Sequence, residues 1–430
     1  MTDYLLVVLD DVIAGTLTRL KGGRLRFDYS DDYRDREAAT PLSLSMPTQV
    51  KSHPDSAITP WLWGLLPDND LVLSRWAREF HVSASSPFSL LSTPIGEDCA
   101  GAVRFTASDG MDRVLQRSGA IAWLTEDEVA DRLRDLRQDS AAWLGKDFTG
   151  QFSLAGAQAK TALYFQDGRW GVPSGSTPTT HILKPAVAGF DDHDLNEHLC
   201  LDAARRAGLV AVRTRVVRFG DESAVVVDRY DRQVRGSTII RVHQEDVCQA
   251  LDLPPSGKYQ NEGGPGPGAI ASLLRRVMSP RVGDEAVSRF ADALIWNWLI
   301  AGTDAHAKNY SLLLASDQVR LAPLYDIASA LPYGTHEKKL RLAMKVGGDY
   351  GVFPSRNRWP AAAKELGLDV EVLVDRVREL GSRTPDAFVD AAKATDVVAL
   401  ARPMPGRLVD LIADRAARCT NLIAARAQEA

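Results

Sequence analysis

The sequence has few cysteines, no long apolar run and no signal-like start, and each of these absences excludes a class of protein. Its four cysteines stand far apart, at Cys99, Cys200, Cys248 and Cys419. Without a Cys-x-x-Cys pair, neither a disulfide scaffold nor a zinc ribbon is expected, and a reducing compartment fits. The densest apolar stretch, residues 293–300, contains Asn297 and is too short to span a bilayer. Because the chain opens without a basic, apolar signal, we expect a soluble cytoplasmic protein with no membrane partner.

The charge balance and composition are those of an ordinary globular protein. The chain has 51 Lys and Arg residues against 56 Asp and Glu residues, a net charge of −5. A protein that coats nucleic acid through bulk charge is therefore not indicated. Hydrophobic residues make up 45% of the 430 positions and charged residues 25%, which argues against disorder. This length is sufficient for two or three domains with a buried core.

Hydrophobic patterning predicts an α+β protein. Segments rich in Val, Ile, Leu and Phe, separated by turn residues, predict a β-meander over residues 5–29. A helix is expected to start at Thr59-Pro60, with Pro at the first helical position. A second β-containing block covers residues 161–230, and most of the chain beyond Gly268 is helical apart from one hairpin at 310–325. We therefore expect a β-rich N-terminal part and a mostly helical C-terminal part.

Polar side chains gather in the short connection after an apolar helix that ends at Gly302. Asp304 and Asn309 lie in this connection, and a hairpin with legs of nearly equal length follows them. Hairpin geometry brings Asp326 back beside Asn309 and Asp304. Two carboxylates and an amide at one place form a hard-oxygen site suited to magnesium. This order is the layout of protein kinases, whereas the alternative is that the three residues only form turns and cap a helix.

Two further segments are candidates for contact with phosphate groups. Residues 153–160 carry small side chains that allow the backbone to approach a phosphate closely. The segment has a single Gly and matches no standard phosphate-loop pattern, so a plain β-turn is the alternative. Lys184 ends an apolar strand segment and needs an anionic partner, either a nucleotide phosphate or Glu197 on the following helix. A solvated lysine at a strand end is the other interpretation.

Taken in order, the motifs of this chain resemble those of the HipA family of bacterial serine/threonine kinase toxins from type II toxin–antitoxin modules. The resemblance runs from the N-terminal β block to about Tyr333. The matching segments are SLAGAQAKTAL (153–163), THILK (180–184), NE (196–197), VVDRYDR (226–232), HQEDVCQAL (243–251), KYQNEGGPG (258–266), TDAHAKN (303–309) and LYD (324–326). The resemblance implies a two-subdomain kinase-like fold. Its parts would be an N-terminal β-rich subdomain (1–108), a nucleotide-binding lobe (109–240) and a helical catalytic lobe (241–430).

The same resemblance implies roles in catalysis and regulation. Asp304 would be the catalytic base and Lys184 would contact the phosphates of ATP. Asn309 and Asp326 would be the ligands of Mg²⁺. Ser153 would be the site of an autophosphorylation that expels the phosphate loop and silences the kinase.

The resemblance also implies how the nucleotide is held. Asp228 and Tyr230 would flank the adenine. The other nucleotide-contacting residues would be Leu154, Ala155, Gly156, Ala157, Lys160 and His306. The chain departs from the family at Ala159 and at Asp228, two positions that often carry Glu. Neither change touches the expected base or metal ligands.

The implied function is ATP- and Mg-dependent phosphorylation, on Ser or Thr, of a cytosolic protein of the translation machinery. The implied partner is a HipB-like helix-turn-helix antitoxin, through which operator DNA would be contacted indirectly. Two alternatives remain open at this point. The chain could be a co-repressor subunit with a weakly active nucleotide site, or a nucleotidyl or small-molecule transferase on the same fold.

Overall fold

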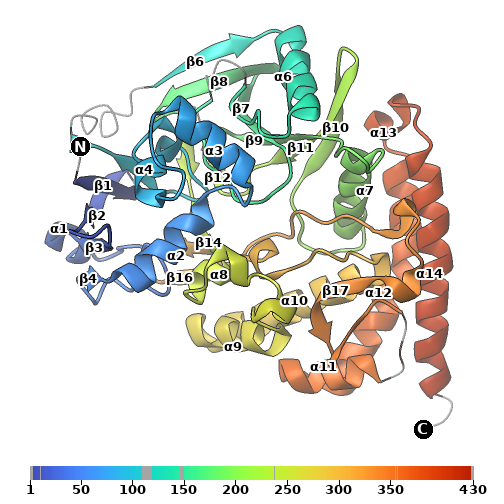
Figure 1. Ribbon diagram of the computed structural model, residues 1–430. Helices are drawn as coiled ribbons and strands as arrows, with labels where there is room; N and C mark the ends of the chain where they lie inside the picture. Colours follow the sequence, from blue (N-terminus) through green and yellow to red (C-terminus); the bar gives the residue numbers. More distant parts are fainter. Residues whose placement is uncertain are drawn as a thin grey trace.

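The structure, a computed structural model, describes residues 3–9, 11–108, 119–145, 150–236, 238–353, 355 and 357–427. Strands and short helices form the N-terminal part, a larger antiparallel sheet follows, and the C-terminal half is mainly helical (Figure 1). This arrangement confirms the predicted α+β, kinase-like architecture.

The N-terminal part is built on a five-stranded antiparallel sheet of order β4-β3-β2-β1-β5. Its strands are β1 (Tyr4–Leu9), β2 (Val12–Arg19), β3 (Leu25–Tyr29), β4 (Ser52–His53) and β5 (Arg104–Thr106). In β3, Leu25, Phe27 and Tyr29 are buried and alternate with more exposed polar residues, as expected of a sheet with one covered face. The helices of this part are α1 (Asp31–Arg34), α2 (Asp55–Leu65), α3 (Asp70–Glu79), α4 (Pro87–Leu91) and η1 (Pro94–Glu97).

The helix predicted to start at Thr59-Pro60 begins one turn earlier, so that prediction was wrong. Helix α2 starts at Asp55, and Pro60 lies inside it. An internal proline removes one backbone hydrogen bond. Asp55 Oδ1 accepts hydrogen bonds from Thr59 Oγ1 (2.8 Å) and from the N–H of Leu25 (2.7 Å), which ties the first turn of α2 to β3. Trp61 and the leucines near it are buried, and this burial outweighs the missing hydrogen bond.

The central sheet has six antiparallel strands in the order β10-β11-β9-β7-β8-β6. They are β6 (Gly119–Leu124), β7 (Thr161–Gln166), β8 (Arg169–Gly175), β9 (His181–Pro185), β10 (Thr214–Phe219) and β11 (Glu222–Asp228). Val226 packs in the cluster of α6 (Glu126–Gln138), whereas Val225 and Val227 pack in that of α7 (His193–Arg206). Since successive residues of a strand point to opposite faces, these two helices cover opposite faces of the sheet.

The C-terminal half is organised around α10 (Pro280–Ile300), whose last three turns are almost entirely buried. Its other helices are α8 (Val247–Ala250), η3 (Pro255–Gly257), η4 (Gln260–Glu262), α9 (Pro267–Val277), η5 (Ala307–Asn309), η6 (Leu331–Tyr333), η7 (Glu337–Lys339), α11 (Arg358–Leu366), α12 (Val370–Ala392), α13 (Thr395–Ala399) and α14 (Met404–Ala427). Its strands are β12 (Arg232–Arg235), β13 (Thr238–Arg241), β14 (His243–Asp246), β15 (Ser311–Ala315), β16 (Gln318–Leu321), β17 (Arg341–Val346) and β18 (Asp349–Gly351).

The hairpin predicted at 310–325 is present as β15 and β16, and β14 adds a third, unpredicted strand beside β15. The return leg is shorter than predicted, because β16 ends at Leu321. Beyond it, Leu324 forms an isolated parallel bridge with Ala211, at the start of the chain that leads into β10. This contact directs the chain into the residues that precede Asp326.

The predicted domain boundaries stay predictions. The first, between 108 and 109, falls at the edge of residues 109–118, which lie outside the described residues. The second, between 240 and 241, falls inside β13. Among the described residues, no helix combines the length and the apolar character needed to cross a membrane.

Candidate active site

One cavity of about 460 Å³ lies where the N-terminal part, the central sheet and the C-terminal helices meet. All of the expected base, metal and nucleotide residues line it: Leu154, Ala155, Gly156, Ala157, Lys160, Lys184, Asp228, Tyr230, Asp304, His306, Asn309 and Asp326. These residues come from several segments that together span more than 150 positions of the chain. The structure therefore brings together in one place the residues that the sequence singled out separately.

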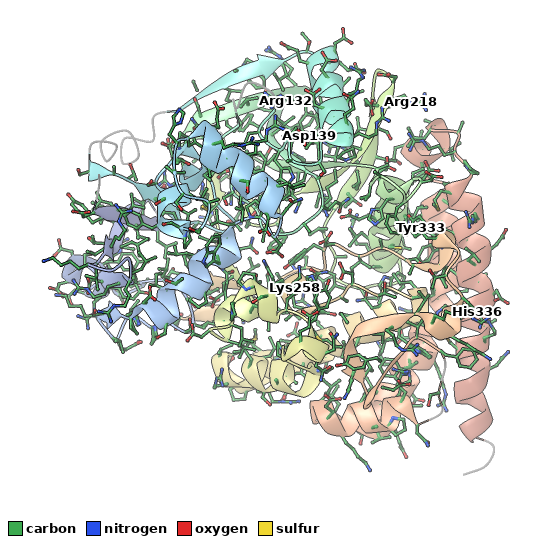
Figure 2. The ribbon with its side chains drawn as sticks, in the orientation of Figure 1. Arg132, Asp139, Arg218, Lys258, Tyr333 and His336 are labelled. Atoms are coloured by element: carbon green, nitrogen blue, oxygen red, sulfur yellow. The ribbon has the colours of Figure 1, made fainter. Side chains whose placement is uncertain are left out.

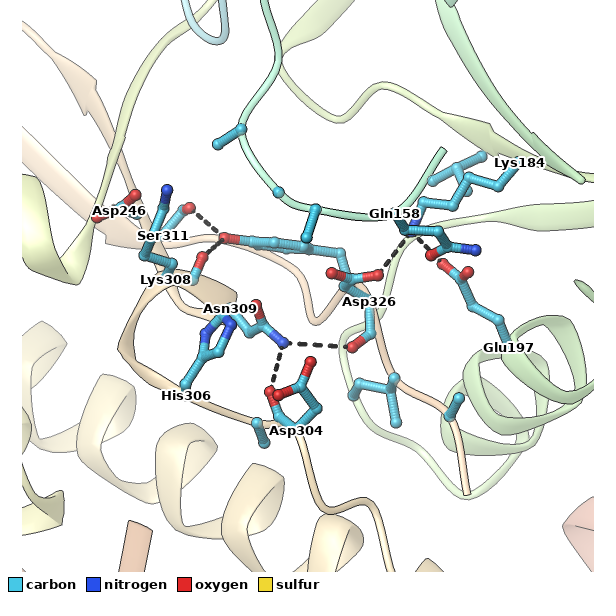
Figure 3. Close-up of a pocket in the computed structure, with 18 of the residues that line it drawn as sticks. Gln158, Lys184, Glu197, Asp246, Asp304, His306, Lys308, Asn309, Ser311 and Asp326 are labelled. Carbon is cyan, nitrogen blue, oxygen red and sulfur yellow. Dashed lines mark hydrogen bonds and ion pairs between the residues drawn. The ribbon is translucent and has the colours of Figure 1, made fainter. Parts of the chain in front are cut away.

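Lys184 is the electrostatic centre of this cavity (Figure 3). Its Nζ donates hydrogen bonds to Glu197 Oε1 (2.7 Å) and to Asp326 Oδ1 (2.6 Å). Burial by itself would lower the pKa of Lys184, but the two carboxylates outweigh burial and raise it. The same interaction holds the pKa of Asp326 well below its usual range despite burial. A charged lysine and an ionised aspartate thus face each other at neutral pH, and the interpretation of Lys184 as a solvated residue is wrong.

Asp304 and Asn309 occupy the tight connection after α10. That helix ends at Ala301 in the left-handed conformation, and a Cβ on Gly302 would lie 2.3 Å from Asn297 Oδ1, so a larger residue there would require the buried Asn297 side chain to move. Asn309 Nδ2 donates to the carbonyls of Asp304 (2.9 Å) and Asp326 (3.5 Å). Figure 3 shows these bonds linking the two loops. The predicted convergence of the three residues is therefore present.

The donor set fits a magnesium ion. Asn309 uses its amide nitrogen inside the protein, which leaves its oxygen as the atom for a ligand, and Asp304 and Asp326 add carboxylate oxygens. Oxygen atoms of this kind are the ligands that Mg²⁺ prefers. Four buried atoms of residues that line the cavity also lack a hydrogen-bond partner among the described residues: Gln158 Nε2, His193 Nδ1, Glu197 Oε2 and His306 Nδ1. Because buried polar atoms are normally hydrogen-bonded, these atoms are available to bind a polar ligand in the cavity.

The segment 153–160 forms a bend over the cavity in front of β7. Gly156 adopts a positive φ of 105°, and Lys160 Nζ donates to the carbonyl of Ala155 at 2.7 Å. Burial and the nearby charge of Lys184 lower the pKa of Lys160 to about 7. Ser153 itself is fully buried, and its Oγ donates to the carbonyl of Leu65 at 2.8 Å. The serine therefore lies behind the loop in this conformation, not in the cavity.

Asp228 and Tyr230 lie along the edge of the cavity at the end of β11. The carboxylate of Asp228 faces His181 Nε2 at 3.2 Å, and the backbone N–H of Asp228 donates to the carbonyl of Arg213 at 3.0 Å. The ring of Tyr230 stacks on Tyr325, with centroids 5.7 Å apart. Both side chains are thus held by neighbouring residues, so they shape this edge of the cavity.

Sequence reasoning assigned no role to several other residues of the cavity. Tyr259 donates from its hydroxyl to Asp304 Oδ1 at 2.7 Å, and its ring contacts His306 edge-on. Lys258 and Lys308 both donate to Asp68. Tyr259 and the two lysines lie in matching motifs, which was an available signal, whereas Asp68 lies in no motif and no local pattern indicates it.

Two family models match this chain. The HipA N-terminal domain model matches residues 5–106, and the HipA-like C-terminal domain model matches residues 152–388. Y4mE of Sinorhizobium fredii, provisionally named a kinase, is 31% identical over 420 residues, which cover 95% of this chain and 96% of that protein. The serine/threonine-protein kinase toxin HipA of Shewanella oneidensis is 26% identical over 391 residues, 86% of each protein.

A solved structure shares the fold. A chain in the complex of Shewanella oneidensis HipA, HipB and operator DNA superposes with a TM-score of 0.83 at 23% identity, over 97% of this chain and 98% of that one.

Proposed function

The chain belongs to the HipA family, and from this premise we propose that it is the kinase toxin of a toxin–antitoxin module. It transfers the γ-phosphoryl group of ATP to a serine or threonine hydroxyl of a cytosolic protein, with a component of the translation machinery as the expected target. The observation that supports this most directly is the convergence of Asp304, Asn309 and Asp326 beside a buried, charged Lys184.

Each residue has a defined task in this proposal. Asp304 orients the acceptor hydroxyl and takes its proton as the oxygen forms a bond to the γ-phosphorus. The bond from that phosphorus to the bridging oxygen breaks, and ADP leaves. Asn309 and Asp326 would hold Mg²⁺, which supplies neutralisation of the phosphate charges when bound. Lys184 is fixed by Glu197 in a position to contact the phosphates, so little ordering is left for the moment of reaction.

The proposal includes a protein partner. The solved structure with the same fold belongs to a complex of HipA with HipB and operator DNA. We therefore expect a HipB-like helix-turn-helix antitoxin to bind this chain and to bring it to operator DNA indirectly. Autophosphorylation at Ser153 is the second expected means of silencing.

Phosphoryl transfer by matched variants tests the activity. Purified protein is incubated with Mg-ATP and a lysate depleted of ATP, and incorporated phosphate is measured by mass spectrometry. Asp304→Asn is expected to lower transfer by about 10²–10⁴-fold, the range for loss of a general base. Asp317→Asn, in the exposed turn of the same hairpin, serves as the control and keeps full activity.

Three outcomes would contradict the proposal, each in a different way. Undiminished transfer by Asp304→Asn removes the assigned base. Addition of AMP in place of phosphate identifies a nucleotidyl transferase. Tight Mg-ATP binding with no transfer by the unaltered protein favours the co-repressor alternative.

A further inference from the structure

A single aspartate of the N-terminal part reaches across to the loop that carries the expected catalytic base. Asp68 lies between α2 and α3, and its Oδ1 accepts from Lys308 Nζ at 2.5 Å. Its Oδ2 accepts from Lys258 Nζ at 3.0 Å. Lys308 is the residue before Asn309, and 240 positions separate it from Asp68. One carboxylate thus joins two lysines from different segments of the C-terminal half.

This contact is buried. The side chain of Lys308 is 3% exposed and that of Asp68 is 11% exposed. Burial would raise the pKa of Asp68, but Lys308 and Lys258 outweigh it and lower the pKa, so the carboxylate is ionised. Removing one member of a buried ion pair leaves the other charge without compensation, which is strongly destabilising. Lys258 lies in the middle of the molecule, next to α8 (Figure 2).

The same short segment also holds the loop over the cavity. The N–H of Asp68 donates to the carbonyl of Gly156 at 3.0 Å, and Asn69 Nδ2 donates to the carbonyl of Ala157 at 3.4 Å. The carbonyl of Leu65 accepts from Ser153 Oγ. Residues 65–69 therefore contact the segment 153–160 through the backbone of Leu65 and Asp68 and the side chain of Asn69, and the segment 304–309 through the side chain of Asp68.

Lys308 transmits this contact to the expected catalytic residues. Its carbonyl accepts from the hydroxyl of Tyr325, the neighbour of Asp326, at 2.6 Å. Ala307, which precedes Lys308, donates its N–H to the carbonyl of Lys258 at 3.2 Å. The side chain of Lys308 points to Asp68 and so is not available to a phosphate group. Because Lys308 precedes Asn309 in the chain, its ion pair with Asp68 is well placed to fix the loop.

We infer that Asp68 is a positioning residue, supplied by the N-terminal part, that fixes the loop 304–309 relative to the phosphate loop 153–160 through its ion pair with Lys308. The inference rests on the proposed kinase function for its effect on turnover. A displacement of about 1 Å of a reacting group is enough to slow catalysis by up to 10²-fold. The tether thus makes the chemistry of the C-terminal half depend on the N-terminal part.

The test compares Asp68→Asn, Asp68→Glu and the neutral pair Asp68→Asn/Lys308→Met with the unaltered protein. Asp70→Asn, an exposed position two residues away, is the matched control. The measurements are ADP formation from Mg-ATP, the Kd of Mg-bound AMPPNP by calorimetry, the melting temperature, and hydrogen exchange of the amides of residues 304–309.

Asp68→Asn is expected to lower kcat by about tenfold or more while the nucleotide Kd changes by less than about threefold, because the expected base lies in the tethered loop whereas most of the expected nucleotide contacts lie outside it. Exchange at residues 304–309 is expected to accelerate. Asp68→Glu keeps the charge and recovers part of the rate. The neutral pair recovers part of the melting temperature but not the rate, since it removes the buried charge of Lys308, although Lys258 still lacks its carboxylate, and it leaves the tether absent.

Two results would overturn the inference. A neutral pair with the unaltered rate would show that the ion pair serves stability alone. Unchanged exchange at residues 304–309 in both the single variant and the neutral pair would show that the loop is held by other contacts. The exchange measurement needs no turnover, so an unaltered protein that forms no ADP contradicts the kinase proposal while the positioning role is still decided.

Discussion

At the scale of single residues, two lysines in the same cavity have pKa values that are shifted in opposite directions. Two carboxylates raise the pKa of Lys184. Lys160, which is buried beside the ring of Trp143 and donates to a carbonyl, has its pKa lowered to about 7 by burial and by the charge of Lys184. Lys184 therefore stays protonated at neutral pH, whereas Lys160 gains or loses its proton near neutral pH.

This difference predicts that nucleotide binding takes up a proton. A phosphate group near Lys160 favours the ammonium form and raises its pKa, so above pH 7 binding must be accompanied by protonation. Affinity for Mg-ATP is then greatest near pH 7 and falls toward pH 9, by at most about tenfold per pH unit. Calorimetry at pH 8 in two buffers of different ionisation enthalpy measures the uptake, which is expected to be about one proton.

Lys160→Met is the variant that checks the origin of the proton. It is expected to abolish most of the uptake and to flatten the dependence of affinity on pH. Equal proton uptake by the variant and the unaltered protein would assign the titration to another group.

At the scale of elements, the loop 153–160 is held in place by a serine whose hydroxyl lies inside the protein. Ser153 is fully buried against the carbonyl of Leu65. A phosphate carries a charge of about −1.5 to −2, and the site offers it a carbonyl oxygen, which repels it. A phosphorylated Ser153 therefore cannot remain in this position, and the loop that it begins must move with it.

This geometry predicts the effect of phosphorylation on nucleotide binding. Phosphorylated protein, or Ser153→Glu, is expected to bind Mg-ATP at least about tenfold more weakly, because burial of an unpaired charge costs several kcal/mol. Ser153→Ala loses one hydrogen bond and is expected to bind within about threefold of the unaltered protein. Calorimetry with the three proteins measures these affinities, and equal values for the phosphorylated form and Ser153→Ala would refute the switch.

At the scale of the whole molecule, a buried group of charges joins the N-terminal part to the rest. Asp98, which follows η1, accepts from Arg232 (2.9 Å), Arg241 (3.1 Å) and Arg229 (3.3 Å). Thr179 donates to it from its N–H and its hydroxyl, at 3.0 and 2.7 Å. These cations hold the pKa of Asp98 far below its usual range although burial opposes this.

Asp98→Asn is expected to lower the free energy of unfolding by about 3–5 kcal/mol, because it removes the buried counter-charge of Arg241 and leaves Arg229 and Arg232 with Asp231 alone. Urea denaturation followed by tryptophan fluorescence measures the change. Asp31→Asn, which removes the exposed ion pair with Lys51, is the control and is expected to have a much smaller effect. A loss for Asp98→Asn no larger than that of the control would mean that the charge group is not needed for stability.

Much of the candidate site can be predicted from local patterns. The turn after α10, the hairpin that follows and the strand that ends at Lys184 are specified by residues close to one another in the chain. The hairpin turns the chain back toward Asn309, and the contact of Leu324 with Ala211 completes the return of Asp326. The capping box of Thr125 and Glu128 is also local and is present at the start of α6. The start of α2 is not local, because burial of Trp61 and its neighbours overrides the signal of Pro60.

The sequence by itself determined the chemical groups of the site and their order, because turns, strands and helix ends depend on near neighbours. Only the tertiary structure determined that Asp68 pairs with Lys308, that Ser153 is buried against the carbonyl of Leu65, and that Asp98 forms ion pairs with three arginines. Each of these contacts joins segments at least 88 residues apart. Such partners are selected by burial and charge compensation across the whole fold, which no short stretch of sequence encodes.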